Sequence, residues 1–148
     1  MANTAGFKEL ANRLRALGPR VAKNKLRRAV GAGATVIKKE AKVLAAVDTG
    51  EMKKDIQVKR ERDQQGDLLS VTYSVFVRTG KKSRASGRSR NVDKDSWYWR
   101  QQEFGNSKMA AQPFMRPAFE SKKEDAVRVI AEKLDEGIQT AARELASQ

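Results

Sequence analysis

Two prolines constrain this chain more than any other feature of its sequence. Pro113 and Pro117 lie in the segment 98–120, which has the sequence YWRQQEFGNSKMAAQPFMRPAFE. Each proline lacks a backbone N–H, fixes φ at about −65° and disfavours helical geometry for the residue before it. The same segment carries several of the chain's large apolar side chains: Phe104, Phe114, Met115 and Phe119. We therefore expect a rigid elbow that buries Phe114 and Phe119 and docks a C-terminal helix on the core.

Apolar residues at helical spacing predict three helices around this segment. The spacing from Phe7 to Leu17 predicts a short first helix that ends at Gly18, and Pro19 to Ala46 is predicted as a long second helix. We expect Pro117 to open a last helix that ends near Ala146. The apolar stripe expected on the second helix is Val21, Leu26, Ala29, Val30, Gly33, Ile37, Ala41 and Leu44, and that on the last is Ala126, Ile130, Leu134, Ile138, Ala141 and Leu145.

The apolar period changes to two in the middle of the chain. Ile56 and Val58 alternate with polar residues, and so do the apolar residues from Leu69 to Val77, which predicts a β-hairpin with one buried face. A hairpin is marginal alone, so the long helices must cover this face, with a third strand from residues 97–104 or from a neighbouring subunit as an open alternative. The fold class is therefore α+β, with long N-terminal and C-terminal helices packed on a small antiparallel β-sheet. The 148 residues are expected to form a single domain, 1–148.

Composition excludes several kinds of chemistry. The chain has no cysteine and no histidine, so disulfides, thiolate metal sites and the commonest general base are absent. We expect no enzyme, no cofactor and no metal. No apolar run approaches the roughly 18 residues of a membrane span, and the N-terminus has no apolar signal core, so we expect a protein made and used in solution without a membrane. The formal net charge of +13 favours an anionic partner without identifying it.

The segment 80–96, GKKSRASGRSRNVDKDS, is expected to be a basic, flexible loop. Its sequence is polar and rich in glycine and serine, and Trp97, Tyr98 and Trp99 follow it directly. Such a loop can bind nucleic-acid phosphate with aromatic stacking, can act as an arm that becomes ordered on assembly, or can simply be solvated. The sequence leaves these three interpretations open. The basic residues at issue are Lys81, Lys82, Arg84, Arg88 and Arg90.

Two blocks of sequence carry a family resemblance. Residues 103–119, EFGNSKMAAQPFMRPAF, are similar to E-F/Y-G-T-S-K-x-x-A-x-P-F-x-R-P-A-F, and residues 47–56, VDTGEMKKDI, are similar to V-D-T-G-x-L-x-x-S-I. In this order and spacing the blocks resemble the tail-completion proteins of tailed bacteriophages, the head–tail joining family that includes lambda's minor tail protein Z. Asn106 stands where threonine is usual and Asp55 where serine is usual. Each departure exchanges one small polar residue for another.

The resemblance implies a structural virion protein of the phage neck, at the tail end nearest the head, which completes the tail and joins it to the head. It implies other neck and tail proteins as partners (the tail terminator and the head-completion or connector proteins), a homo-oligomeric ring with a hexamer favoured, and synthesis in the bacterial host cytoplasm before incorporation into the virion. Contact with phage DNA stays open, and a basic nucleic-acid-binding protein is the alternative function. The expected interaction residues are Lys81, Lys82, Arg84, Arg88, Arg90, Trp97, Trp99, Glu103, Phe104, Phe114 and Arg116.

Overall fold

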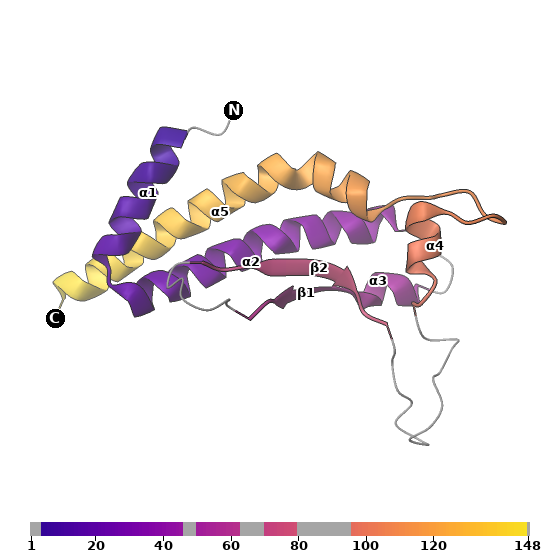
Figure 1. Cartoon of the computed structure of the whole chain (residues 1–148). Helices are drawn as coiled ribbons and strands as arrows, with labels where there is room; N and C mark the ends of the chain where they lie inside the picture. The colour runs from indigo at the N-terminus through magenta and orange to yellow at the C-terminus, as the bar shows by residue number, and fades with distance from the viewer. Residues whose placement is uncertain (1–3, 46–49, 63–69, 80–95, 148) are drawn as a thin grey trace, which may run out of the picture. The chain divides into compact units, whose positions relative to one another are not determined.

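The computed structural model describes residues 4–45, 50–62, 70–79 and 96–147 (Figure 1). Its elements, in chain order, are α1 (Thr4–Ala16), α2 (Pro19–Leu44), α3 (Glu51–Asp55), β1 (Ile56–Arg60), β2 (Tyr73–Val77), α4 (Trp99–Phe104) and α5 (Met115–Ala146). Two long helices and a two-stranded sheet confirm the α+β class. The break between the first two helices is where the sequence predicts it, because Gly18 has φ of 83° and Pro19 is the first residue of α2.

β1 and β2 form an antiparallel hairpin. The Arg78 N–H donates to the Asp55 carbonyl at 2.8 Å, and the Glu61 N–H donates to the Thr72 carbonyl at 2.9 Å. Both bonds belong to one register, in which each step forward along β1 is matched by one step back along β2. This register places Ile56 opposite Val77, and both side chains are buried. The predicted alternation therefore selects the correct inner face of the hairpin.

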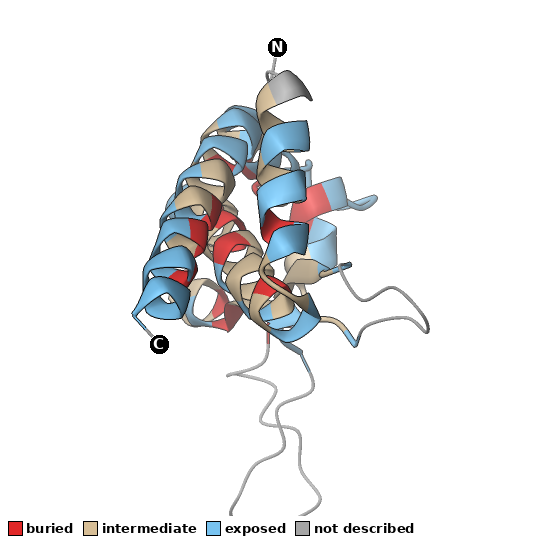
Figure 2. Cartoon of the chain, turned by 90° about the vertical axis from the view of Figure 1, so that its left-hand side faces the viewer, coloured by how far each residue is buried: buried red, intermediate tan, exposed pale blue. Residues whose placement is uncertain are grey.

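The described residues fall into two compact units, and both long helices contribute to each. The first unit comprises Met1–Val36, Arg60–Ser74 and Lys123–Gln148. Its core joins α1, the first half of α2 and the second half of α5, whose buried residues lie on the facing sides of the helices (Figure 2). These core residues are Leu14, Ala22, Ala29, Leu134 and Ile138.

The helices of the first unit approach closely at Gly33. A Cβ placed on this glycine would lie 2.5 Å from Cγ1 of Ile130 on α5. Real Cβ atoms do not come so near another carbon, so only glycine fits here without a shift of the Ile130 side chain or of α5. Gly33 was expected on the apolar stripe of the second helix, and the structure shows that its role there is to allow close helix packing.

The second unit comprises Ile37–Lys59 and Val75–Lys122. Its core brings together the end of α2, the hairpin and the start of α5 around Phe114, whose side chain is fully buried. The other core residues are Ala41, Ala45, Met52, Ile56, Val77 and Ala118. This cluster confirms, within the second unit, that α2 and α5 cover the apolar face of the sheet.

Several details of the sequence-based prediction are wrong. Residues 99–104 form helix α4 and not a third strand, and Phe119 is 50% exposed although it was expected to be buried. Leu44 and Leu145 lie on the predicted apolar stripes, but they are 42% and 57% exposed because both stand near the ends of their helices. The second strand begins at Tyr73, and the residue Leu69 at which it was expected to begin lies outside the described residues.

Candidate functional site: the elbow between α4 and α5

We use the term elbow for residues 97–119, which comprise α4, the turn that follows it and the first turn of α5. The carboxylate of Glu103, near the end of α4, organises this segment. Its Oε2 accepts hydrogen bonds from the backbone N–H of Phe114 at 2.8 Å and of Met115 at 3.0 Å. Its Oε1 accepts a third bond, from the backbone N–H of Arg116 at 3.0 Å. Glu103 therefore caps α5 from a position eleven to thirteen residues earlier in the chain.

Pro117 completes this cap. The first four backbone N–H groups of a helix have no partner within the helix. The first backbone hydrogen bond between turns of α5 is donated by the N–H of Ala118 to the carbonyl of Phe114. The backbone N–H groups at positions 114 to 117 therefore need acceptors outside the helix. Glu103 satisfies the first three, and proline at 117 has no N–H to satisfy. Pro117 was expected to open the helix, but the structure places it third, after Met115 and Arg116.

The ionisation of Glu103 is coupled to this geometry. Burial of the side chain raises the pKa of its carboxyl. The three backbone hydrogen bonds, together with the nearby charge of Arg116, outweigh burial, so the pKa lies below its ordinary value of 4.5. The carboxylate is therefore charged near neutral pH. A negative charge at the N-terminus of α5 also interacts favourably with the dipole of this long helix.

The turn between α4 and α5 is held by its own backbone. Gly105 ends α4 with φ of 73°, and a Cβ on it would lie 2.9 Å from the backbone nitrogen of Ala111. Asn106 and Met109 exchange two backbone hydrogen bonds, at 2.9 and 3.3 Å, and form a bridge. The Gln112 N–H donates to the carbonyl of Gln102 at 2.8 Å, which joins the returning chain to α4. The turn is therefore ordered although residues 106–113 are all exposed.

Large apolar side chains are exposed on this ordered frame. Phe104 is 66% exposed, Phe119 50%, Trp97 52% and Met109 41%. Phe114 is the exception, since its fully buried side chain anchors the frame to the core, as predicted. The contrast between an anchored base and exposed apolar groups is typical of a surface that contacts a partner.

Asp55 holds two further segments of the second unit together. Its carboxylate is fully buried, and Oδ2 accepts a hydrogen bond from the hydroxyl of Ser96 at 2.8 Å. Oδ1 lies 3.6 Å from a guanidinium nitrogen of Arg78, which follows β2. Asp55 thus joins the chain just after β2 to the chain just before α4. The sequence comparison treated Asp55 as one small polar residue in place of another, whereas the structure shows a specific buried contact.

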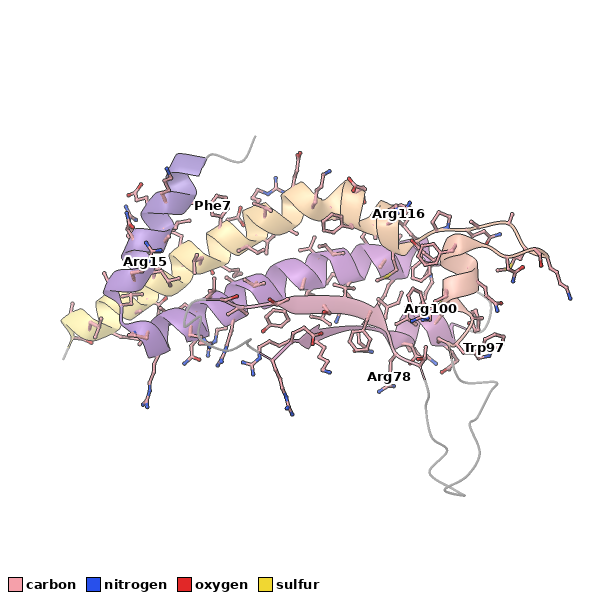
Figure 3. The ribbon with its side chains drawn as sticks, in the orientation of Figure 1. Phe7, Arg15, Arg78, Trp97, Arg100 and Arg116 are labelled. Atoms are coloured by element: carbon pink, nitrogen blue, oxygen red, sulfur yellow. The ribbon has the colours of Figure 1, made fainter. Side chains whose placement is uncertain are left out.

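The expected interaction residues fall into four groups. Lys81, Lys82, Arg84, Arg88 and Arg90 lie outside the described residues. Trp97, Phe104 and Arg116 are exposed on the elbow, where Figure 3 places Trp97 beside α4 and Arg116 at the first turn of α5. Glu103 and Phe114 are buried and hold the elbow in shape, and Trp99 is half-buried with the guanidinium carbon of Arg100 5.6 Å from its ring centre.

The sequence did not identify Asp55, Ser96, Gln102 and Gly105 as individual contributors to this site. Asp55 and Ser96 are 41 residues apart, and no local pattern links them. Gly105 carried a usable signal, because a glycine directly after a helical segment often takes positive φ and ends the helix.

Metal binding and membrane spanning find no support in the described part of the chain. Within it, no three His, Cys, Asp or Glu side chains are grouped so that they could hold a metal ion. None of the described helices has the length and apolar composition that a membrane span requires.

Comparison with known proteins gives one match. A family model described as Bacteriophage HK97-gp10, putative tail-component, matches residues 8–105 of the chain. No curated protein and no solved structure matches the chain. The matched range includes the block 47–56 and ends at Gly105, inside the elbow. It therefore supports a phage tail family, while the specific likeness to lambda's protein Z stays a prediction.

Proposed function

The chain belongs to the HK97-gp10-like family of bacteriophage tail components, and from this premise we propose that it occupies the tail end nearest the head, where it completes the tail and joins it to the head. Family membership makes it a structural component of the virion that interacts with other virion proteins. The finer position, at the neck, rests on the elbow sequence 103–119 and on its structure. Its partners there would be the tail terminator and the head-completion or connector proteins.

The rigid, exposed elbow is the observation that carries the proposal. Three bonds to Glu103 and the close approach at Gly105 fix a segment whose exposed residues contribute little to the core. A segment with this combination is suited to contact with another protein, since rigid groups lose little conformational entropy on binding. A joining protein needs such a surface, because it must bind two different assemblies.

We further propose a homo-oligomeric ring in the virion, with a hexamer favoured. A ring of this kind encircles the axis along which the phage tail and head meet. Closed rings are built from one repeated contact, in which a surface of each copy binds a different surface of the next copy. Sedimentation of the purified protein measures whether the ring forms before assembly. Cryo-electron microscopy of the virion neck measures the number of copies.

Loss of the gene tests the joining function directly. Cells infected with a phage carrying a nonsense mutation in this gene should accumulate separate, complete heads and separate tails, visible by electron microscopy. Addition of the purified wild-type protein to such a lysate should restore joined, infectious particles. If heads and tails join normally without the protein, the proposed function is wrong.

The basic residues of segment 81–90 are proposed to assist assembly by contacting acidic neighbours or DNA. Replacement of Lys81, Lys82, Arg84, Arg88 and Arg90 by serine should lower the yield of joined particles while the melting temperature of the isolated protein stays nearly unchanged. Normal joining by this variant across a range of salt concentrations would show that the segment has no role in assembly.

Binding of nucleic acid is the second candidate function, and exposed basic residues at the end of β1 favour it. Lys59, Arg60 and Arg62 are exposed, and the formal net charge of the chain is +13. A dedicated nucleic-acid-binding protein should bind short duplex DNA at physiological ionic strength, with an affinity that falls steeply as salt increases. Binding only at very low ionic strength would instead reflect unspecific attraction.

A further inference from the structure

Each of the three parts of the elbow presents one exposed cationic side chain close to one exposed apolar side chain. On α4 these are Arg100 and Phe104, four residues apart and thus on one face of the helix. At the turn they are Lys108 and Met109. On α5 they are Arg116 and Phe119, three residues apart and again on one face.

The elbow exposes no compensating acid. Glu103 is the only Asp or Glu among residues 97–119, and its carboxylate is buried against three backbone N–H groups. The outward surface of residues 97–119 is therefore apolar and carries positive charges only, and the first exposed acid after it is Glu120 on α5. Figure 1 shows the turn at 105–114 extending away from α4, so this surface includes a projection.

We propose that the elbow is the docking element for a different virion protein, which receives it in an apolar groove rimmed by carboxylates. The proposal rests on the proposed function and names the surface and the chemistry of the partner. Apolar groups at the centre of such a contact supply most of the affinity, and opposite charges at the rim set the orientation and speed the encounter.

Charge argues for a different protein and against a second copy of the same elbow. A symmetric contact between two elbows would bring Arg100, Lys108 and Arg116 of one copy against the same residues of the other. Like charges placed opposite one another in an interface oppose association. Contacts between copies in the proposed ring would then join two different surfaces of the chain and would not place elbow against elbow.

The hydrogen bonds within the elbow also support a docking role. Asn106, Gln112 and Glu103 hold the turn with hydrogen bonds to the backbone before any partner is present. A preformed projection loses little conformational freedom on binding, so a modest apolar contact suffices for stable docking. Phe104 and Met109 are the apolar groups that a receiving groove would cover.

The test uses purified tails and purified heads from phage that lack this protein. Each is mixed with purified protein and sedimented, and the bound protein is measured as its concentration is varied. Wild-type protein should co-sediment with one of the two particles. The double variant Phe104→Ser/Met109→Ser should need about thirtyfold more protein for half-saturation, as expected for removal of central contacts. Lys108→Glu should weaken binding and reverse part of its salt dependence.

Control variants replace exposed groups outside the elbow. Val127→Ser and Leu145→Ser change exposed apolar residues of α5 outside the elbow, and both should bind as the wild type does. Arg143→Glu is the matched control for the charge. All variants should keep the wild-type circular dichroism spectrum and melting temperature to within about two degrees, because the replaced side chains are exposed.

The remaining outcomes overturn the inference in different ways. If the elbow variants bind like the wild type while wild-type protein joins heads to tails, the function stands and the docking element lies elsewhere. If wild-type protein self-associates in solution and the double variant is monomeric, the elbow binds a second copy. If wild-type protein binds neither particle, the proposed function fails, and the inference fails with it.

Discussion

Replacement of Glu103 by glutamine tests the physical argument for the elbow most directly. The side chains have almost the same shape, but glutamine is neutral and offers one acceptor oxygen in place of two. If the glutamine keeps the wild-type geometry, that oxygen can serve Phe114 and Met115 from the position of Oε2. The amide NH₂ then faces the N–H of Arg116, a donor against a donor. Two bonds lose their charge assistance and the third is lost.

The expected cost follows from the number and kind of these bonds. One side-chain cap contributes about 1 kcal/mol to stability, and hydrogen bonds to a charged group contribute about 1.5–3 kcal/mol each without being additive. We therefore expect Glu103→Gln to lower the free energy of unfolding by about 2 kcal/mol and Glu103→Ala by about 3 kcal/mol. For a chain of this size the alanine variant should melt about 10 °C below the wild type.

The dependence on pH separates a charged cap from simple packing. The folded-state pKa of Glu103 is lowered, so its contribution is fully present above the ordinary value of 4.5 and is lost as the pH falls through the lower folded value. Urea unfolding at pH 7, 5, 4 and 3 should show a difference between wild type and Glu103→Gln that is constant down to about pH 5. Below about pH 4.5 the difference should shrink.

Glu124→Gln is the matched control, because Glu124 is an exposed glutamate near the start of the same helix. Its effect should stay within about 0.5 kcal/mol at each pH. A difference for Glu103→Gln that is the same at pH 3 as at pH 7 would refute the charged cap. An effect no larger than that of Glu124→Gln would show that the three hydrogen bonds contribute little.

Three further comparisons test the burial of Phe114, the helix packing at Gly33 and the hydrogen bond of Ser96, each by urea unfolding at pH 7. Phe114→Ala should cost about 3 kcal/mol through lost burial and a cavity, whereas Phe119→Ala should cost less than about 0.5 kcal/mol, and equal effects would contradict the burial contrast. Gly33→Ala should lower the free energy of unfolding by about 2 kcal/mol through overpacking against Ile130. This cost should be smaller when Ile130→Ala is also present, and an equal cost in both backgrounds would contradict the close approach. Ser96→Ala should cost about 2 kcal/mol because the buried carboxylate of Asp55 loses a donor, while Ser147→Ala near the end of α5 should be nearly neutral.

The parts of the fold that depend on local pattern could be predicted from the sequence. The break at Gly18-Pro19, the long helix after it and the inner face of the hairpin each follow from spacing over a few residues. The failures occur where distant contacts decide. Residues 97–104 are rich in aromatic side chains, which favour strands, but α4 forms with the half-buried Trp99 packed against the core cluster of the second unit.

The sequence predicted where the elbow lies but not which interactions hold it in shape. The prolines and aromatic residues of 98–120 indicate a rigid elbow, and the structure confirms this for Phe114 and for the frame around it. Which aromatic side chain is buried could not be inferred, because Phe114, directly before α5, and Phe119, within it, belong to the same short apolar cluster. The cap by Glu103 could not be predicted either, since an acceptor eleven residues before the N–H group that it caps belongs to no local capping pattern.

Two buried carboxylates explain how a basic protein keeps both its shape and its surface charge. The chain has 18 acidic residues against 31 basic ones, and Asp55 and Glu103 direct their negative charge inward, to Ser96 and Arg78 in one case and to the start of α5 in the other. Burial of a carboxylate destabilises the fold unless the carboxylate is hydrogen-bonded, so Asp55 and Glu103 are tolerated in the interior only while they keep their hydrogen bonds. Because the negative charge of Glu103 is held inward, the three exposed cations of the elbow meet no opposing acid within it. The same residue that fixes the projection therefore also leaves it positively charged, which is the property that an acidic partner would recognise.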